Sequence, residues 1–524
     1  MHASALDLEA LAREFGPAAR DRKLAALQAL ADRPSPRGRR LRALEAALEF
    51  LRAYPDDAEI LARVRTAVAR LPATARVVHP FSYDVARRLS RLHPEGIEIA
   101  WDELDDEGPF LEALGLLVNP VDQQGLDDED VSLQDWCAAV RPAGVPTDLA
   151  LFLHLLERSG LPAAVREFLF TRAGLPLAFT GPVRPRIELP GRAPVCQAEP
   201  IPRAHFPIRP VIETPLPRPA RGGQDVIDLA LRALAVRALE IYPLIHASAA
   251  AVRVHALERG IQIAVVGVEP QWRTPLESLW FFLVLKNGAP IAYGPAGIFC
   301  GVCEMGINVF PEFRGAEIRL VDALLMRVLH QAYGARHFHL VPYAMGRDNP
   351  DAIRSGAFWF YRKLGFVPTN PGVEALARAE EARMAEQPGH RSDRRMLHRL
   401  SDTAAMLDLS GGRCRPFPFG ALGLAHSAWL AREFAGDRAR AARVCAARIR
   451  RRLGIPDSLA LAGLAPLLCQ IEDLAGWPRR DLDLLGRILA AKSAPSESAA
   501  EPLFQRLPRL ENALRALAGT AVQD

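Results

Sequence analysis

The sequence is poor in cysteine, in long apolar runs and in lysine, and each shortage excludes a class of protein. Its seven cysteines are an odd number scattered over 524 residues, which excludes a fold held by a disulfide framework. No apolar run reaches the ~18–20 residues that span a bilayer. The N-terminal stretch MHASALDLEALAREF contains acidic residues and lacks the apolar core of a signal peptide. We therefore expect a cytoplasmic protein without a membrane segment.

Positive charge comes almost entirely from arginine, because only Lys23, Lys286, Lys363 and Lys492 are lysines. The 65 basic residues are nearly balanced by 61 acidic ones, which gives a net charge of +4. No long basic stripe with interleaved aromatic residues is present, so the composition disfavours nucleic acid as a partner. The chain is 49% hydrophobic and 24% charged, as globular domains are. Its length predicts two or three such domains.

Residues that often bind metal are present, but not at the spacing of a metal site. Cys300 and Cys303 form a CxxC pair, yet no second pair follows at zinc-site spacing. Residues three apart in a strand also point to opposite faces. His337 and His339 alternate on one strand face without a nearby third ligand, which favours an ordinary exposed strand face. We expect no metal.

The chain divides into four stretches that differ in composition and in the periodicity of their apolar residues. Residues 1–178 show apolar residues at helical spacing between turn signals, which predicts a mainly helical N-terminal domain. Residues 179–222 are crowded with proline, which fixes φ and removes N–H donors, so we expect an extended linker without helix or central strand. Residues 223–370 mix helix and strand patterns, and residues 371–524 are again amphipathic and helical. A protein partner would bind to the helical flanks or to the Pro-rich linker.

Residues 223–370 alternate between the helical and the strand period. Asn287-Gly288 supplies the positive φ of a two-residue hairpin turn, and Gly334 is the residue type that ends helices. The expected elements, in chain order, are a helix over 224–245, strands over 260–268, 276–299 and 303–310, a helix over 314–332, a strand over 335–343 and a helix over 351–363.

Three stretches of this region resemble the GNAT superfamily of acyl-CoA N-acyltransferases. INVFPEFRG at 307–315 is similar to the family's fourth strand and the turn after it, and LVDALLMRVL to the helix that follows. NPDAIRSGAFWFYRKLGF at 349–366 is similar to the family's closing Asn, Ala, Tyr and Gly-Phe pattern. The resemblance implies an α+β fold with a central GNAT-like mixed sheet and flanking helices. Mainly helical regions would lie at both ends of the chain.

The resemblance also implies acetyl-CoA or another acyl-CoA as the co-substrate. In such a site the pyrophosphate is held by free N–H groups at a helix N-terminus, aided by the helix dipole. The positions in this sequence that match the family's phosphate-binding turn are Arg314, Gly315, Ala316, Ile318 and Arg319.

The remaining site residues follow from the same resemblance. The pantetheine arm would lie beside the strand that carries Ile307 and Val309, as an added strand pairs with an edge. Asn349 would contact the cofactor or only cap the next helix. Tyr361 stands where many members carry the acid that protonates the leaving thiolate, and Glu304 is the candidate base. An odd number of positions separates Glu304 from Val309, so the two face opposite sides of the sheet. A core role for Tyr361 and a strand-edge role for Glu304 stay open.

The phosphate-binding turn departs from the family's usual RGxGxG. It reads RGAEIR at 314–319, with Glu317 and Arg319 in place of the later glycines. A carboxylate repels pyrophosphate, although Arg314 and Arg319 would compensate with positive charge. Three functions therefore stay open: an active acyltransferase, a GNAT-like binding module without catalysis, and a scaffold in which the helical flanks act. The sequence does not say whether the acceptor amine belongs to a small molecule or to a protein.

Overall fold

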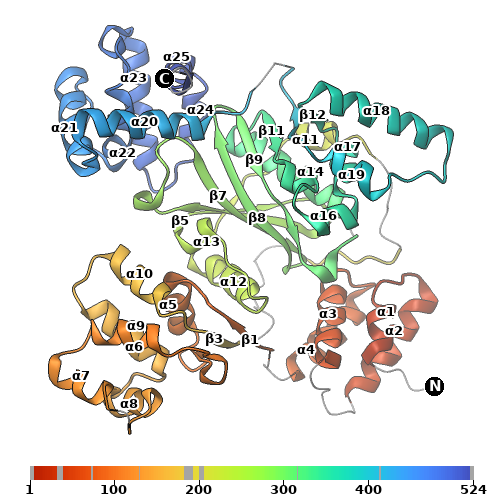
Figure 1. Ribbon diagram of the computed structural model, residues 1–524. Helices are drawn as coiled ribbons and strands as arrows, with labels where there is room; N and C mark the ends of the chain where they lie inside the picture. The colour runs from red at the N-terminus through yellow and green to blue at the C-terminus, as the bar shows by residue number, and fades with distance from the viewer. Residues whose placement is uncertain are drawn as a thin grey trace. The chain divides into compact units, whose positions relative to one another are not determined.

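The computed structural model describes residues 5–31, 39–71, 75–128, 130–181, 193–199, 206–315, 317–411 and 415–519 (Figure 1). The chain forms two compact units. Unit 1 comprises Met1–Pro200, Gly222–His246 and Lys286–Pro290, and unit 2 comprises Ile201–Arg221, Ala247–Leu285 and Ile291–Asp524. This division differs from the expected one, because the helix after residue 223 belongs to unit 1. The central sheet and the C-terminal helices belong together in unit 2.

Unit 1 consists of helices and one small antiparallel sheet. The strands of this sheet lie in the order β1-β3-β2. Its strands are only three to five residues long, too short to show an alternating pattern, and the expectation of a mainly helical stretch missed them. The elements are α1 (Ala5–Leu11), α2 (Pro17–Ala31), α3 (Arg39–Ala53), α4 (Ala58–Arg70), β1 (Ala75–His79), α5 (Tyr83–Leu92), β2 (Ile97–Ile99), α6 (Gly108–Gly115), α7 (Pro120–Leu126), α8 (Leu133–Val140), α9 (Asp148–Arg158), α10 (Ala163–Arg172), β3 (Leu177–Gly181), α12 (Gln224–Ala235) and α13 (Tyr242–Ile245).

Unit 2 contains a large mixed sheet with helices around it. This arrangement confirms the expected α+β class with flanking helical regions. Its elements are α11 (Ile208–Glu213), β4 (Ala220–Arg221), β5 (Ala247–Ala256), β6 (Ile261–Val268), β7 (Ser278–Lys286), β8 (Ala289–Phe299), β9 (Val302–Met305), β10 (Asn308–Val309), α14 (Ile318–Tyr333), β11 (His337–Leu340), α15 (Pro342–Met345), α16 (Pro350–Ser355), α17 (Ala357–Lys363), β12 (Val367–Pro368), α18 (Pro371–Glu386), α19 (Arg394–Leu400), β13 (Ala405–Asp408), α20 (Phe419–Phe434), α21 (Arg438–Leu453), α22 (Leu459–Leu468), α23 (Arg479–Ser493), α24 (Ala500–Phe504) and α25 (Pro508–Gly519).

The strands of the large sheet lie in the order β12-β13-β11-β9-β8-β7-β6-β5-β4, and β10 pairs with β8. Among the strand pairs whose register the structure describes, β9 and β11 run parallel and the others run antiparallel. The secondary structure differs from the sequence prediction at three places. Alanine-rich β5 lies where no strand was expected, β13 interrupts the C-terminal stretch predicted to be helical, and α11 and β4 lie in the expected linker. Such short segments have little periodicity of apolar residues. Their secondary structure is therefore determined by burial within the sheet.

The two faces of the sheet near β11 are covered by different elements. His337 and His339 share one face with Phe299, because β9 links the registers of β8 and β11. On that face, Phe299 stacks edge-on against Phe417 with ring centroids 4.9 Å apart. Leu407 lies on the other face, next to the turn that follows α17. The C-terminal helices therefore cover one face, and α17 approaches the other.

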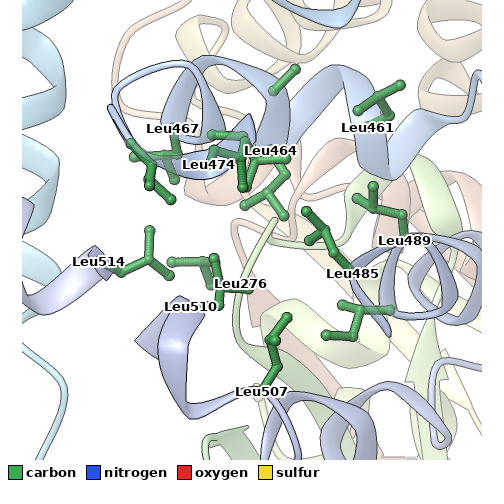
Figure 2. Packing of buried hydrophobic residues seen from close by; sticks show 14 of the residues in the cluster. Leu276, Leu461, Leu464, Leu467, Leu474, Leu485, Leu489, Leu507, Leu510 and Leu514 are labelled. Carbon is green, nitrogen blue, oxygen red and sulfur yellow. The ribbon is translucent and has the colours of Figure 1, made fainter. Parts of the chain in front are cut away.

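The C-terminal helices α20 to α25 pack around a cluster rich in leucine (Figure 2). Leu276, which precedes β7, belongs to this cluster together with residues of α22, α23 and α25. Burying each such side chain contributes roughly 1.5–3 kcal/mol. The C-terminal helices and the sheet therefore share one apolar core within unit 2. The leucines labelled in the cluster are Leu276, Leu461, Leu464, Leu467, Leu474, Leu485, Leu489, Leu507, Leu510 and Leu514.

The path of β8 beside the next strand depends on a glycine. A Cβ at Gly294 would lie 1.8 Å from the carbonyl oxygen of Gly306 and 2.7 Å from the ring of Phe282. Gly306 lies between β9 and β10, and its N–H donates to the carbonyl of Pro295. Its own carbonyl oxygen therefore cannot move aside, and no side chain fits at position 294. Gly420, at the start of α20, has open space around it.

We therefore expect Gly294→Ala to lower the free energy of unfolding by about 3 kcal/mol or more, as severe overpacking does. Gly420→Ala is the matched control. It should be neutral or raise that free energy by up to ~1 kcal/mol, because alanine is the better helix former. Urea unfolding of both variants measures the difference. Equal stability would show that β8 and the following strand do not approach each other this closely.

Candidate functional site

A strand edge opens where β9 and β11 stop pairing. The parallel register joins Val302 to His337 and ends at Glu304 and His339. The chain from β9 into β10 continues antiparallel to β8 in an unbroken register, with Met305 opposite Ala296 and Asn308 opposite Tyr293. Residues beyond Glu304 thus keep one neighbouring strand and lose the other.

The backbone groups of Ile307 and Val309 face this open edge. The N–H of Gly306 donates to Pro295, and the N–H of Phe310 donates to Ile291. In an antiparallel ladder, alternate residues bond to the same neighbour, and those between them point away. The odd-numbered residues 307 and 309 therefore direct their N–H and C=O groups away from β8. Both are half-buried, so an extended ligand could pair with them.

The turn after β10 leads into the N-terminus of α14. Gly315 has φ +81°, the left-handed conformation that glycine tolerates best. Among the described residues, the N–H of Val321 donates to the carbonyl of Glu317, and the side chain of Glu317 does not cap this end of α14. The N–H groups of a first helical turn are available to an anion. Ala316 lies outside the described residues.

Glu317, the residue that departs most from the family turn, is buried in an ion pair. Its side chain is 3% exposed and contacts the guanidinium of Arg259 in the β5–β6 connection. The positive partner balances the carboxylate and holds it beside that connection. The repulsion expected between Glu317 and a pyrophosphate is therefore reduced.

The two arginines that were expected to compensate for Glu317 differ in position. Arg314 is exposed. Arg319 donates from Nη2 to the carbonyls of Phe206 and Lys363, both at 2.8 Å, and its guanidinium lies over the ring of Phe206. These contacts connect the segment around Phe206 and the end of α17 to α14. Arg319 therefore has a structural role here.

Asn349 caps α16. Its Oδ1 accepts from the N–H of Ala352 at 3.1 Å, and its Nδ2 donates to the carbonyl of Tyr343 at 3.2 Å. Both ends of the side chain are thus used within the protein. The capping role is the one that the structure shows for Asn349.

Tyr361 lies on α17 and is 8% exposed. Its ring meets Phe366 edge-on with centroids 5.8 Å apart. Burial raises the pKa of the Tyr361 hydroxyl, and the negative charge of Asp322 raises it further. The hydroxyl is therefore protonated at neutral pH, as a proton donor must be. The same features also suit a core aromatic.

Asp322 is a buried carboxyl that the sequence reasoning did not single out. It lies in α14, is 0% exposed, and neither of its oxygens has a hydrogen-bond partner among the described residues. Burial raises its pKa to about 7. Buried carboxyls without partners are rare and often mark functional sites. A helical projection of LVDALLMRVL could have found it as the only acid among apolar residues.

Glu304 and His339 form a close pair on neighbouring strands. Nδ1 of His339 lies 3.3 Å from Oε2 of Glu304. The Glu304 side chain is 54% exposed, whereas that of His339 is 11% exposed. The expectation that His337 and His339 lie on an exposed strand face was wrong, because both are at least nine-tenths buried. Neighbouring strands and C-terminal helices cover this face.

His337, Asp408 and Ser410 approach one another without forming a catalytic triad. Oγ of Ser410 lies 3.2 Å from Nε2 of His337, and Oδ1 of Asp408 lies 3.1 Å from Nδ1. Ser410 Oγ also donates to that same Oδ1 at 3.1 Å. The lone-pair directions of the two ring nitrogens diverge. Ser410 Oγ and Asp408 Oδ1 are too close together for each to lie along one of these directions. Nδ1 of His337 accordingly makes no hydrogen bond. Asp408 instead organises the turn after β13.

No group of three or more His, Cys, Asp or Glu residues that could hold a metal ion occurs within the described ranges. Cys300 lies in the turn between β8 and β9, and Cys303 is fully buried in β9, where burial raises the pKa of its thiol. Such a thiol is poorly suited to metal binding, because the ligand is the thiolate. In the part of the chain that the structure describes, no helix is long and apolar enough to cross a bilayer.

Comparisons with known proteins assign no family. A scan of protein-family models and searches of curated proteins and solved structures found no match to the chain.

The buried carboxyl of Asp322 predicts a pH-dependent stability. Its pKa is about 7 in the folded chain and about 3.9 when unfolded. The raised value means that the protonated form fits the fold and that ionisation is unfavourable. The wild type should lose up to about 4 kcal/mol relative to Asp322→Asn as the pH rises from about 4 to about 7.

Thermal unfolding of both proteins across that range tests the prediction. The two curves should lie closest together at the acidic end and separate as the pH rises. A constant difference between wild type and Asp322→Asn would mean that the carboxyl keeps its ordinary pKa and is hydrated. Asp351→Asn, at an exposed position on α16, is a control that should not alter the pH dependence.

Proposed function

We propose that the chain is an N-acyltransferase that moves an acyl group, in the simplest case acetyl, from an acyl-CoA to an amine. The observation that carries this proposal is the open edge at Ile307 and Val309, which leads directly into the N-terminus of α14. An acyl-CoA has an extended amide-containing arm and an anionic pyrophosphate. The edge offers backbone groups for the arm, and the helix start offers N–H groups and a favourable dipole for the phosphates.

The reaction needs a base on the acceptor side and an acid for the leaving thiolate. The amine nitrogen attacks the thioester carbonyl, the carbon–sulfur bond breaks, and the sulfur takes a proton from Tyr361. Glu304 lies on the sheet face opposite to Val309, next to the point where β9 and β11 part. A base there would meet the amine from the side away from the arm.

A binding module without catalysis is the second candidate. Glu317 in place of a glycine favours it, because its ion pair with Arg259 fills space at the start of α14. In that case the chain would bind acyl-CoA weakly or not at all, and no turnover would occur. The two functions therefore differ in a measurable property.

Calorimetry with acetyl-CoA and with longer acyl-CoAs distinguishes them. We expect heat of binding and a rise in the unfolding temperature, because a ligand that binds only the folded state stabilises it. No heat and no thermal shift at millimolar ligand would rule out the acyltransferase.

Proline at position 309 tests the strand edge itself. If the N–H of Val309 faces the ligand, Val309→Pro should fold, since proline is tolerated where an edge N–H points away from the sheet. The affinity for acetyl-CoA should fall about tenfold, the value of one hydrogen bond. Val309→Ala keeps the N–H and is the matched control. Asn308→Pro should instead disrupt the pairing of β10 with β8.

Tyr361→Phe tests the acid. It removes one oxygen atom and keeps the ring that packs on Phe366. Turnover of acetyl-CoA should fall by roughly 100-fold, the scale of general acid catalysis, with little change in acetyl-CoA affinity. Unchanged turnover would leave Tyr361 as a core aromatic only.

A further inference from the structure

Three side chains gather on one face of the sheet where β9 and β11 part. Glu304 on β9 lies opposite His339 on β11 and opposite Gly297 on β8. The carboxylate of Glu277, which precedes β7, lies over Gly297. A Cβ at that glycine would be 2.3 Å from Oε1 and 2.7 Å from Cδ of Glu277. The absence of a side chain at position 297 thus makes room for the carboxylate beside Glu304.

The contact with Glu304 fixes the chemical state of the imidazole. A neutral histidine carries its proton on one nitrogen, and a carboxylate at Nδ1 keeps it there. Nδ1–H therefore donates to Glu304, and Nε2 presents its lone pair. No described residue makes a hydrogen bond to Nε2 of His339. A nitrogen base oriented by a carboxylate is the arrangement that general-base catalysis uses.

Other charged groups lie near the pair of Glu304 and His339. Burial, followed by the charge of Glu304, raises the pKa of Glu277 to about 7. Lys492, on α23, donates to the main-chain oxygen of Glu277 at 3.0 Å and pairs with Glu497. Along β11 the same face carries His337, whose Nδ1 lies 3.1 Å from Oδ1 of Asp408 in β13. The lysine is thus neutralised, and the local charge around His339 is negative.

We propose that His339 is the general base of the reaction and that Glu304 is the residue that positions it. This inference rests on the proposed acyltransferase function and changes the role of Glu304 within it. Both residues belong to the last pair before the strands part, where the open edge begins.

The proton transfers balance in this scheme. A protonated amine gives one proton to Nε2 of His339, and its nitrogen then bonds to the thioester carbon. As the carbon–sulfur bond breaks, the thiolate takes the proton of Tyr361. The adduct nitrogen loses its second proton and restores the tyrosine. His339 releases its proton to water, and the products are an amide, free CoA and one proton.

The tautomer of His339 gives a test that needs no substrate. Nitrogen-15 NMR of histidine-labelled protein, assigned by loss of the signal in His339→Gln, should show Nδ1 protonated and Nε2 bare. Glu304→Gln should weaken that preference, and Gly297→Ala should shift the signal because the new methyl group displaces Glu277. A proton on Nε2 in the wild type would overturn the proposal.

Kinetics with acetyl-CoA and butylamine test the catalytic step. His339→Gln should lower kcat/KM by about 100-fold and remove the acid limb of the pH–rate profile, with unchanged acetyl-CoA affinity. Glu277→Gln leaves the pair of Glu304 and His339 intact and should keep that limb. His398→Gln, on exposed α19, is the matched control.

The failures of the two proposals are distinguishable. If acetyl-CoA binds and His339→Gln keeps the wild-type rate and pH profile, the base role falls and the acyltransferase stands. If acetyl-CoA gives no heat of binding, the acyltransferase falls and the base role falls with it.

Discussion

The end of the parallel pairing between β9 and β11 is the constraint on which the site depends. Up to Glu304 and His339 the two strands hold each other, and beyond this pair β10 is held by β8 alone. A free strand edge inside a sheet is normally paired with another strand or covered by other elements. Unpaired backbone N–H and C=O groups cost free energy when they are buried. Here the edge is half-buried and continues into a helix start. In the function that we propose, this one backbone divergence offers an edge to an extended ligand and leads into the anion site at the start of α14.

The local elements of this region could be predicted because short-range physics determines them. Asn287-Gly288 forms its turn with positive φ at both residues, and Gly334 ends α14 in the left-handed conformation. The alternation of a strand correctly placed Glu304 and Val309 on opposite faces. β5 and β13 could not be found in this way. β5 is rich in alanine, and β13 lies between β11 and β12 although it follows both in sequence, so only long-range pairing defines them.

The roles of the side chains also divide into those set by neighbouring residues and those set by long-range contacts. Asn349 could be predicted as a cap, because its partner lies three residues away. The partner of Glu317 is Arg259, 58 residues earlier. No local sequence pattern predicts that contact. The sequence alone made Glu317 an obstacle to an anion, whereas the fold pairs it with a cation. The pairing of Glu304 with His339 depends likewise on the register of two strands separated by the whole of α14.

The carboxyl groups around the site have a common physical property. Asp322 and Glu277 belong to different elements, yet burial raises the pKa of each to about 7. Asp322 influences Tyr361, on the helix that approaches one sheet face, and Glu277 lies beside Glu304 on the other. Ionising either group costs stability, so a fold selected for stability alone would replace both with neutral residues.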